Sequence, residues 1–500
     1  MNRDRMLARL EDRSTEWDLL VIGGGATGLG TALDAATRGY RTVLLEQADF
    51  GAGTSSRSTK LIHGGVRYLR NGELGLVRDS LRERGRLLKN APNLVHPLPF
   101  VVPAYRAFDR YYHGAGLTAY DLLAGKLGIE STRHLGREAT LERVPNLAAA
   151  GLHGGTHYWD GQFDDARLCV ALAVTAARHD AVVLNHVRVD ELVKDGGKVR
   201  GATATDRLSG QSYRLAAKAV VNATGVFSDA VRRLDDSAAP AIVEPSQGIH
   251  LVLDAAFLGG ETAVMIPKTD DGRVLFAIPW HGRALLGTTD TPGVPVSLDP
   301  KPLDAEIDYL LEHAARYFTK APARDDIRAS FAGLRPLVRP PDAEKRGGVT
   351  AKFSRDHSLF VSDSGLVTIA GGKWTTYRRM AQDTVDRAAD VAGLERRPCV
   401  TADLALEDRS GADGLKFEDA EWLEKLDPAL PYRLADVVAG VRFEMAQTLE
   451  DILARRTRLN FLDRAAARKC AHRVVRLMAD ELGKDEAWIA AQLKALREAE

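Results

Sequence analysis

The sequence predicts an α/β fold that is followed by an all-helical C-terminal domain. An apolar run, a glycine-rich turn and a helical pattern follow one another within residues 18–46. Strand and helix patterns then alternate, and the short strands between residues 250 and 287 are separated by Gly, Asp and Pro, as in an antiparallel sheet. From Pro398 onward the strand patterns fade, and helices are predicted at Leu434–Ala454, Arg464–Leu482 and Asp485–Arg497.

The first unit consists of a strand at Leu19–Ile22, a helix at Ala26–Arg38 and a second strand at Val43–Leu45. The first strand is followed directly by G-x-G-x-x-G, formed by Gly23, Gly25 and Gly28. These glycines permit a tight turn, close approach of a pyrophosphate and close packing of the helix on the strand, in that order. The helix N-terminus offers free N–H groups to phosphates.

Glu46 ends the second strand, where a carboxylate can accept hydrogen bonds from a ribose hydroxyl. An ordinary α/β unit with a glycine-rich turn would not explain an acid at this position. Strand, glycines, helix, second strand and acid therefore predict dinucleotide binding.

The composition limits which kinds of partner and which cellular compartments fit this chain. The 500 residues are 45% hydrophobic, and Lys+Arg and Asp+Glu both number 68, so no overall basic charge points to nucleic acid. Cys169, Cys399 and Cys470 are far apart, which favours a reducing compartment over a disulfide framework. Met1–Trp17 has no apolar core of a signal peptide, and no run approaches about 18 apolar residues, so we expect no transmembrane helix.

The segment Thr54–Leu69, TSSRSTKLIHGGVRYL, follows the second strand, where a bound dinucleotide would pass. Ser55, Ser56 and Thr59 offer hydroxyl groups, and His63 offers a titratable imidazole. A polar loop with a structural histidine is the alternative interpretation.

Two later turns repeat the strand-to-glycine pattern. Thr224 and Gly225 follow an apolar strand end, and Gly371-Gly372 in LVTIAGGKWTTYR precedes Lys373. In a flavoprotein, such a late turn could present amides to the flavin, and the lysine could lie near a substrate anion or near the N1 side of the flavin. Arg335, between Leu334 and Pro336, has an apolar setting that disfavours a surface ion pair.

Together these segments resemble the FAD-dependent glycerol-3-phosphate dehydrogenases of the bacterial respiratory, quinone-linked type. The resemblance extends over nearly the whole chain from Trp17. It is carried by VIGGGATGLG at Val21–Gly30, Thr54–Leu69, ATG at Ala223–Gly225, GTTD at Gly287–Asp290, AGLRPL at Ala332–Leu337, GGKWTTYR at Gly371–Arg378 and EMAQTLEDILARRTRL at Glu444–Leu459.

The resemblance implies a Rossmann-like FAD-binding domain (1–100, 160–240 and 335–397) interleaved with a mixed or antiparallel-sheet substrate domain (101–159 and 241–334), then a helical domain (398–500). It implies oxidation of sn-glycerol 3-phosphate to dihydroxyacetone phosphate by hydride transfer to flavin N5, with electrons passed to a membrane quinone. A cytoplasmic enzyme bound peripherally to the inner face of the cell membrane is then expected, and a homodimer is allowed.

The resemblance also implies roles for residues. His63 is the expected base and Arg335 its catalytic partner; the expected substrate ligands are Arg67, Tyr68, His250, Lys373 and Lys268. The expected FAD ligands are Gly23, Gly25, Gly28, Glu46, Ser55, Ser56, Thr59, Thr224, Gly225, Gly372 and Thr375, with no metal. The chain departs from the family pattern at SQGIH, where Gln247 stands in place of a lysine.

Three other readings of the residues stay open: an oxidase that uses O₂ on the same substrate, an FAD-binding regulatory protein without turnover, and a nicotinamide dehydrogenase. A membrane contact is also open between two segments. Gly114–Ile129 carries Leu117, Tyr120, Leu123, Leu127 and Ile129 near helical spacing with basic flanks, which suits an interfacial helix or, equally, a core helix. The competing segment contains Arg455, Arg456 and Arg458.

Overall fold

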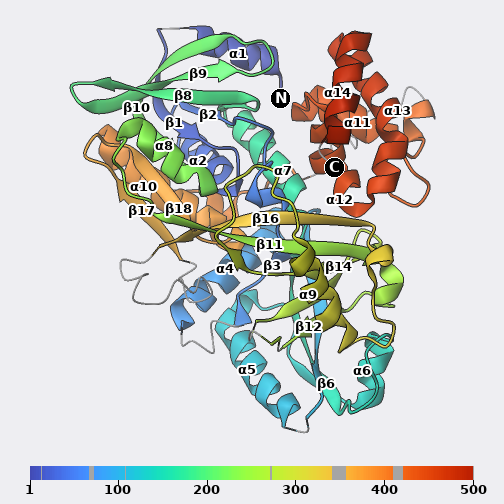
Figure 1. Cartoon of the computed structure of the whole chain (residues 1–500). Coiled ribbons are helices and arrows are strands. Elements are labelled where there is room, and N and C mark those ends of the chain that lie inside the picture. The colour runs from blue at the N-terminus through green and yellow to red at the C-terminus, as the bar shows by residue number, and fades with distance from the viewer. Residues whose placement is uncertain are drawn as a thin grey trace.

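The computed structural model describes residues 1–12, 14–66, 73–106, 108–267, 269–270, 273–339, 356–408 and 420–498. Two sheets lie one beside the other, and a helical C-terminal domain packs at one side (Figure 1). Three of the expected substrate ligands, Arg67, Tyr68 and Lys268, lie outside the described residues.

The first sheet has a parallel centre in the order β18-β10-β1-β2-β7. Since β1, β10 and β18 run parallel, the glycine turns that follow them meet at one edge of the sheet. Its described strands are β1 (Glu16–Ile22), β2 (Thr42–Leu45), β7 (Val182–Leu184), β8 (Val187–Asp195), β9 (Lys198–Asp206), β10 (Ser212–Asn222), β17 (His357–Val361) and β18 (Val367–Gly371).

The second sheet is largely antiparallel, and its longest register pairs β11 with β16 and β4 with β6. The segment at the expected domain boundary, residue 100, lies inside β4. Its described strands are β3 (Leu61–Ile62), β4 (Val95–Ala104), β5 (Arg133–Leu135), β6 (Gly154–Phe163), β11 (Val243–Asp254), β12 (Ala263–Ile266), β13 (Leu275–Trp280), β14 (Arg283–Gly287), β15 (Thr291–Pro292) and β16 (Ala329–Val338).

Helix α2 packs between α10 and α7 on the first sheet. The helices predicted at Arg464–Leu482 and Asp485–Arg497 are confirmed as α13 and α14. The described helices are α1 (Arg3–Glu11), α2 (Ala26–Thr37), α4 (Leu74–Asn90), α5 (Asp109–Ala124), α6 (Arg137–Arg143), α7 (Asp165–Arg178), α8 (Ser228–Asp235), α9 (Asp304–Ala315), α10 (Tyr377–Ala392), α11 (Leu434–Glu444), α12 (Leu459–Leu462), α13 (Arg464–Leu482) and α14 (Glu486–Glu498).

The prediction of one helix over Leu434–Ala454 is wrong. Helix α11 ends at Glu444, and Met445 adopts a left-handed conformation with φ of +58°. A π-helical turn follows at Asp451–Arg456. This break lets Arg455 and Arg456 both reach Asp49, in the loop after β2, with N···O distances of 2.6 Å.

The arginines proposed as a competing membrane site are therefore core residues. Arg455, Arg456 and Arg458 are all buried, and Arg458 pairs with Asp164 at 2.7 Å. Exposing these arginines to lipid headgroups would break the ion pairs and leave the buried carboxylates unpaired, which is strongly unfavourable. The buried network instead joins the helical domain to the loop that follows β2.

Helix α5 explains the apolar stripe in Gly114–Ile129. Leu117 and Tyr120 are buried and Leu123 is half-buried, so this side of the helix is core. The opposite side of α5 is also apolar and faces solvent; it consists of Phe108, Tyr111, Tyr112, Ala115, Ala119 and Leu122 at helical spacing. Among the described residues, none of the helices combines the length and the apolar character that crossing a bilayer requires.

Candidate active site

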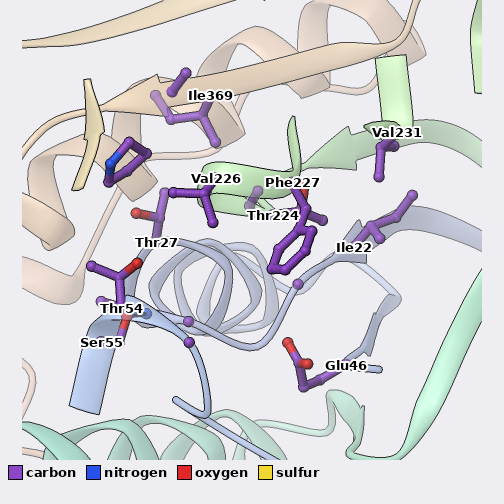
Figure 2. A pocket seen from close by; sticks show the side chains of 18 of the residues that line it. Ile22, Thr27, Glu46, Thr54, Ser55, Thr224, Val226, Phe227, Val231 and Ile369 are labelled. Atoms are coloured by element: carbon purple, nitrogen blue, oxygen red, sulfur yellow. Dashed lines mark hydrogen bonds between the residues drawn. The ribbon is translucent and has the colours of Figure 1, made fainter. Parts of the chain in front are cut away.

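A large cavity, of about 620 Å³, opens where the glycine turns after β1, β10 and β18 meet. Figure 2 shows Thr27, Glu46, Ser55 and Phe227 arranged around this space. Of the predicted FAD ligands, the cavity is lined by Gly23, Gly25, Glu46, Ser55, Thr224, Gly225 and Gly372. The sequence therefore brings three distant turns to one site.

Two of the fingerprint glycines, Gly23 and Gly28, occupy positions where a side chain would collide with the backbone. Gly23 has φ of +109°, and a Cβ there would lie 2.7 Å from the carbonyl oxygen of Ala223. A Cβ on Gly28 would lie 1.9 Å from the oxygen of Gly23, so Gly28 serves the packing of α2 on β1. Gly25 caps α2 without a side chain, which leaves the first turn of the helix directed at the cavity.

Glu46 is held by two backbone amides. The N–H of Gly24 donates to Oε2 at 2.6 Å and the N–H of Ala48 donates to Oε1 at 2.8 Å. Burial raises the pKa of Glu46 above its usual value, and the two amides oppose that rise. The carboxylate is thus fixed at the rim of the cavity, where it can accept a further hydrogen bond.

These residues fit a dinucleotide such as FAD. The cavity combines a helix N-terminus, an anchored acid and an apolar wall of Val226, Phe227 and Ile369. Ser55 Oγ also accepts a hydrogen bond from the N–H of Ala26 at 2.9 Å, which ties the Thr54–Ser56 turn to α2. By contrast, Ser56 is buried outside the lining residues, and Thr59 lines a second cavity.

The second cavity, of 160 Å³, lies between β3, β6, β13 and β16. It brings together His63, Arg335 and Thr59, and neighbouring residues of β16 connect the two cavities, since Arg335 lines the small one and Pro336 the large one. Its size suits a small polar molecule next to a bound dinucleotide.

His63 is positioned through its backbone. Its N–H donates to Thr375 Oγ1 at 3.2 Å, and the same hydroxyl donates to its carbonyl oxygen at 3.1 Å. Thr375, a predicted FAD ligand, is not among the residues that line the large cavity; it instead links the turn after β18 to the His63 loop.

Arg335 is fixed at the wall of the small cavity. Its Nη2 donates to the oxygen of Thr289 at 2.9 Å and to Thr288 Oγ1 at 3.1 Å, and its Nη1 lies 3.4 Å from Asp290 Oδ1. A Cβ on Gly248 would lie 2.3 Å from Nη2, so only glycine leaves room for the guanidinium.

Two predicted substrate ligands, His250 and Lys373, are not among the residues that line the small cavity. His250 lies behind the small cavity: its Nε2 is 2.9 Å from Thr59 Oγ1 and its ring stacks on Phe331. Burial, together with Lys60 and Arg335, lowers the pKa of His250 well below its usual value, so the ring is neutral. Lys373 lines the large cavity, and its Nζ donates to Ser80 Oγ at 2.7 Å.

Two charged residues of the small cavity, Arg273 and Asp160, were not predicted from the sequence. Arg273 precedes β13, and its guanidinium lies 5.3 Å from the ring centre of Tyr309. Asp160, on β6, pairs with Arg84 at 2.9 Å. The only signal for Arg273 was one basic residue in the segment DGRVLF, and the signal for Asp160 was one acid in an apolar strand.

Comparisons with known proteins agree with this geometry. The family model "FAD dependent oxidoreductase" matches residues 18–378, and the model "C-terminal domain of alpha-glycerophosphate oxidase" matches residues 368–489. The mitochondrial glycerol-3-phosphate dehydrogenase of Homo sapiens is 40% identical over 99% of this chain and 74% of its own length, and a probable mitochondrial glycerol-3-phosphate dehydrogenase of Caenorhabditis elegans is 41% identical over 97% and 73%.

A solved structure is similar along the whole chain. The glycerol-3-phosphate dehydrogenase of Bacillus halodurans, complexed with FAD, has a TM-score of 0.79 and 32% identity, and the match covers 99% of this chain and 96% of that one. The L-alpha-glycerophosphate oxidase of Mycoplasma pneumoniae, at 17% identity and a TM-score of 0.60, shares the fold.

Fold and site thus define an FAD-dependent oxidoreductase. Within that class, the chain belongs to the family of glycerol-3-phosphate dehydrogenases.

Proposed function

We propose that this enzyme oxidises sn-glycerol 3-phosphate to dihydroxyacetone phosphate in the small cavity. The observation that carries the proposal is the grouping of one imidazole, His63, with two guanidinium groups, Arg273 and Arg335, directly beside the dinucleotide cavity. A neutral imidazole suits proton abstraction near pH 7, and guanidinium groups suit a phosphate dianion.

His63 takes the proton of the secondary hydroxyl group as the alcohol becomes a ketone. Bound FAD supplies the acceptor for the hydride at flavin N5. Arg335 and Arg273 hold the phosphate. Thr59, which lines the same cavity and whose hydroxyl group lies against neutral His250, adds a hydrogen bond.

The electron acceptor we propose is a membrane quinone, reached from the bilayer surface. The solvent-facing side of α5 (Phe108, Tyr111, Tyr112, Ala115, Ala119 and Leu122) supports this, because an apolar helix face suits burial at the lipid boundary. Exposed Arg106, Arg133 and Arg137 lie near that face in the sequence and suit anionic headgroups. We accordingly propose peripheral binding to the inner face of the cell membrane.

An oxidase that reduces O₂ is the second candidate, since the C-terminal residues match a domain described for alpha-glycerophosphate oxidase. Stopped-flow mixing of the reduced enzyme with O₂ or with a short-chain quinone separates the two. Faster reoxidation by the quinone supports the dehydrogenase; faster reoxidation by O₂ supports the oxidase.

The proposal is tested by adding glycerol 3-phosphate anaerobically to the FAD-loaded enzyme and recording its absorption spectrum. Bleaching of the flavin band by glycerol 3-phosphate, but not by glycerol, is expected. The His63→Gln variant should bleach about 10²–10⁴-fold more slowly, because it lacks the base. An unbleached wild-type spectrum would overturn the substrate, and an unchanged rate in His63→Gln would overturn the role of His63.

A further inference from the structure

Tyr120 of α5 is buried against the loop that carries His63. Helices α4 and α5 lie side by side, close to β6 and β3 (Figure 1), and enclose the tyrosine ring together with Val77 and Leu81. A Cβ on Gly64 would lie 2.6 Å from Tyr120 Oη. The glycine after His63 therefore allows the peptide to approach the tyrosine hydroxyl group.

That hydroxyl group uses both of its hydrogen-bonding capacities. It accepts the N–H of Gly64 at 2.6 Å and donates to Asp160 Oδ2 at 2.8 Å. Asp160 Oδ1 in turn accepts from Arg84 Nη1 at 2.9 Å. Burial and the charge of Asp160 raise the pKa of Tyr120 well above its usual value, so the phenol stays protonated and can serve as both acceptor and donor.

Both polar groups of the peptide bond between His63 and Gly64 are thus held by side chains from distant parts of the chain. Thr375 donates to its carbonyl oxygen at 3.1 Å, and Tyr120 accepts from its N–H at 2.6 Å. The N–H of His63, which belongs to the preceding peptide, is also held by Thr375 Oγ1 at 3.2 Å. Because the planar peptides on both sides of His63 are held, the direction of its Cα–Cβ bond is fixed as well.

We propose that Tyr120 is a positioning residue for the reaction: its hydroxyl group orients the His63–Gly64 peptide so that the imidazole points into the small cavity. The inference rests on the proposed role of His63 as the base. Small displacements of a reacting group slow catalysis far more than they weaken binding, because the transition state demands the narrower geometry. Tyr120 should therefore affect turnover more than substrate affinity.

The test is Tyr120→Phe, which keeps the ring and removes the hydroxyl group. In the FAD-loaded enzyme we expect the rate of flavin reduction by glycerol 3-phosphate to fall about 10- to 100-fold, with KM changed less than about twofold. Amide hydrogen exchange at residues 61–66 should accelerate. The matched control is Tyr40→Phe, which removes a buried hydroxyl group donating to the Glu395 oxygen at 2.6 Å, and which should leave the rate, KM and exchange unchanged.

A double variant distinguishes positioning from general loosening of the structure. If Tyr120 acts through His63, then Tyr120→Phe should slow His63→Gln no further, whereas independent effects would multiply. A normal rate in Tyr120→Phe, or multiplied losses in the double variant, overturns the inference while His63→Gln alone still tests the base. If His63→Gln is not slowed, the role of His63 as the base and this inference both fail, while bleaching of the wild-type spectrum still tests the substrate.

A second variant covers the outcome in which Tyr120→Phe does not retain FAD. Asp160→Asn leaves the ring of Tyr120 in place but removes the charge that orients its hydroxyl proton. The same fall in rate at constant KM, again absent in the His63→Gln background, supports the inference. If Asp160→Asn slows flavin reduction in the His63→Gln variant as well, the inference is overturned.

Discussion

A single hydroxyl group, Thr375 Oγ1, bonds both to the amide nitrogen of His63, at 3.2 Å, and to its carbonyl oxygen, at 3.1 Å. Thr375 lies directly after Lys373 and Trp374, which line the large cavity. The turn after β18 therefore forms part of the proposed FAD site and, one residue later, holds the expected base of the small cavity. The proposed cofactor site and the proposed base thus share one structural element.

Replacing Thr375 with Val keeps the shape of the side chain and removes both hydrogen bonds. We expect flavin reduction to slow about tenfold with little change in FAD affinity, because two neutral hydrogen bonds of about 1 kcal/mol each fix the loop. The control is Thr384→Val, which removes a buried hydroxyl group donating to the Met380 oxygen within α10. A loss of FAD affinity at an unchanged rate would instead support the sequence-based prediction that Thr375 is an FAD ligand.

Arg335→Leu should weaken recognition of the phosphate. Glycerol and glycerol 3-phosphate should then differ less in kcat/KM, since a charge-assisted hydrogen bond contributes roughly 1.5–3 kcal/mol. Arg273→Leu should act in the same direction. The control is Arg328→Leu, which removes an exposed arginine that pairs with Asp254 near the start of β16. If Arg335→Leu and Arg273→Leu both discriminate between glycerol and glycerol 3-phosphate as well as the wild type does, these arginines have a structural role only.

Glu46→Gln should weaken binding of FAD. The glutamine amide keeps one acceptor oxygen, but its NH₂ group faces one of the two backbone N–H groups, of Gly24 or Ala48, that donate to Glu46 in the wild type. We expect a loss of about 1.5–3 kcal/mol in the free energy of FAD binding, or roughly 10- to 100-fold in affinity. Equilibrium dialysis against FAD gives the value, with the exposed Glu16→Gln as the control. Equal affinity in Glu46→Gln and wild type would contradict the role of the carboxylate.

Local sequence predicted those features that depend on local geometry. The fingerprint needs a strand, a helix and glycines in fixed order, and Gly23, Gly25 and Gly28 occupy the expected places. The break after α11 was missed because it follows from distant pairing: Arg455 and Arg456 must both reach Asp49. Apolar periodicity alone cannot reveal such a requirement.

Contacts between distant segments also decide the roles of site residues that the sequence could not predict. Tyr120 belongs to an apolar stripe, and only the tertiary structure brings its hydroxyl group to Gly64. The sequence around His250 contains no feature that distinguishes a substrate ligand from a residue packed behind Thr59. Roles that depend on contacts between distant segments therefore need the structure.

The pair formed by His186 and Asp451 predicts a pH dependence of stability. Burial alone would lower the pKa of His186, but the charge and hydrogen bond of Asp451, at 2.9 Å, raise it above its usual value. Burial alone would raise the pKa of Asp451, but His186 and the neighbouring arginines hold it below its usual value. The pH range over which both groups are charged is therefore wider in the folded protein than in the unfolded chain.

The two groups change the stability of the folded protein with pH in opposite directions. The raised pKa of His186 contributes stability below the unfolded pKa of about 6.5, and this is lost as pH rises through the folded pKa. The lowered pKa of Asp451 contributes stability above about 3.9, and this is lost as pH falls through the folded pKa. The pair should therefore stabilise the protein most between about pH 4 and 6.5.

His186→Gln should flatten the fall in stability above pH 6.5, by up to about 1.4 kcal/mol for each unit of pKa shift. Urea unfolding at pH 6 and pH 8.5 measures the difference, with the exposed His153→Gln as the control. If wild type and His186→Gln lose the same stability between these pH values, the pair does not contribute as described.

The last prediction concerns the solvent-facing side of α5. Phe108 and Leu122 are 72% and 78% exposed, so replacing both with Glu should leave the fold intact. The double variant should no longer sediment with anionic liposomes, because it loses apolar contact area and adds negative charge near anionic headgroups. Reduction of a soluble dye by glycerol 3-phosphate should be unchanged.

The control places glutamate at Leu208, which is 45% exposed in the turn between β9 and β10, away from α5. This variant should still bind liposomes. Leu117 and Leu123 are unsuitable for the test, since their side chains pack inward, and a charge there would damage the core. Sedimentation of the Phe108→Glu, Leu122→Glu variant at the wild-type level would show that α5 does not contact the membrane, and release of the Leu208→Glu variant would show that binding depends on overall charge instead.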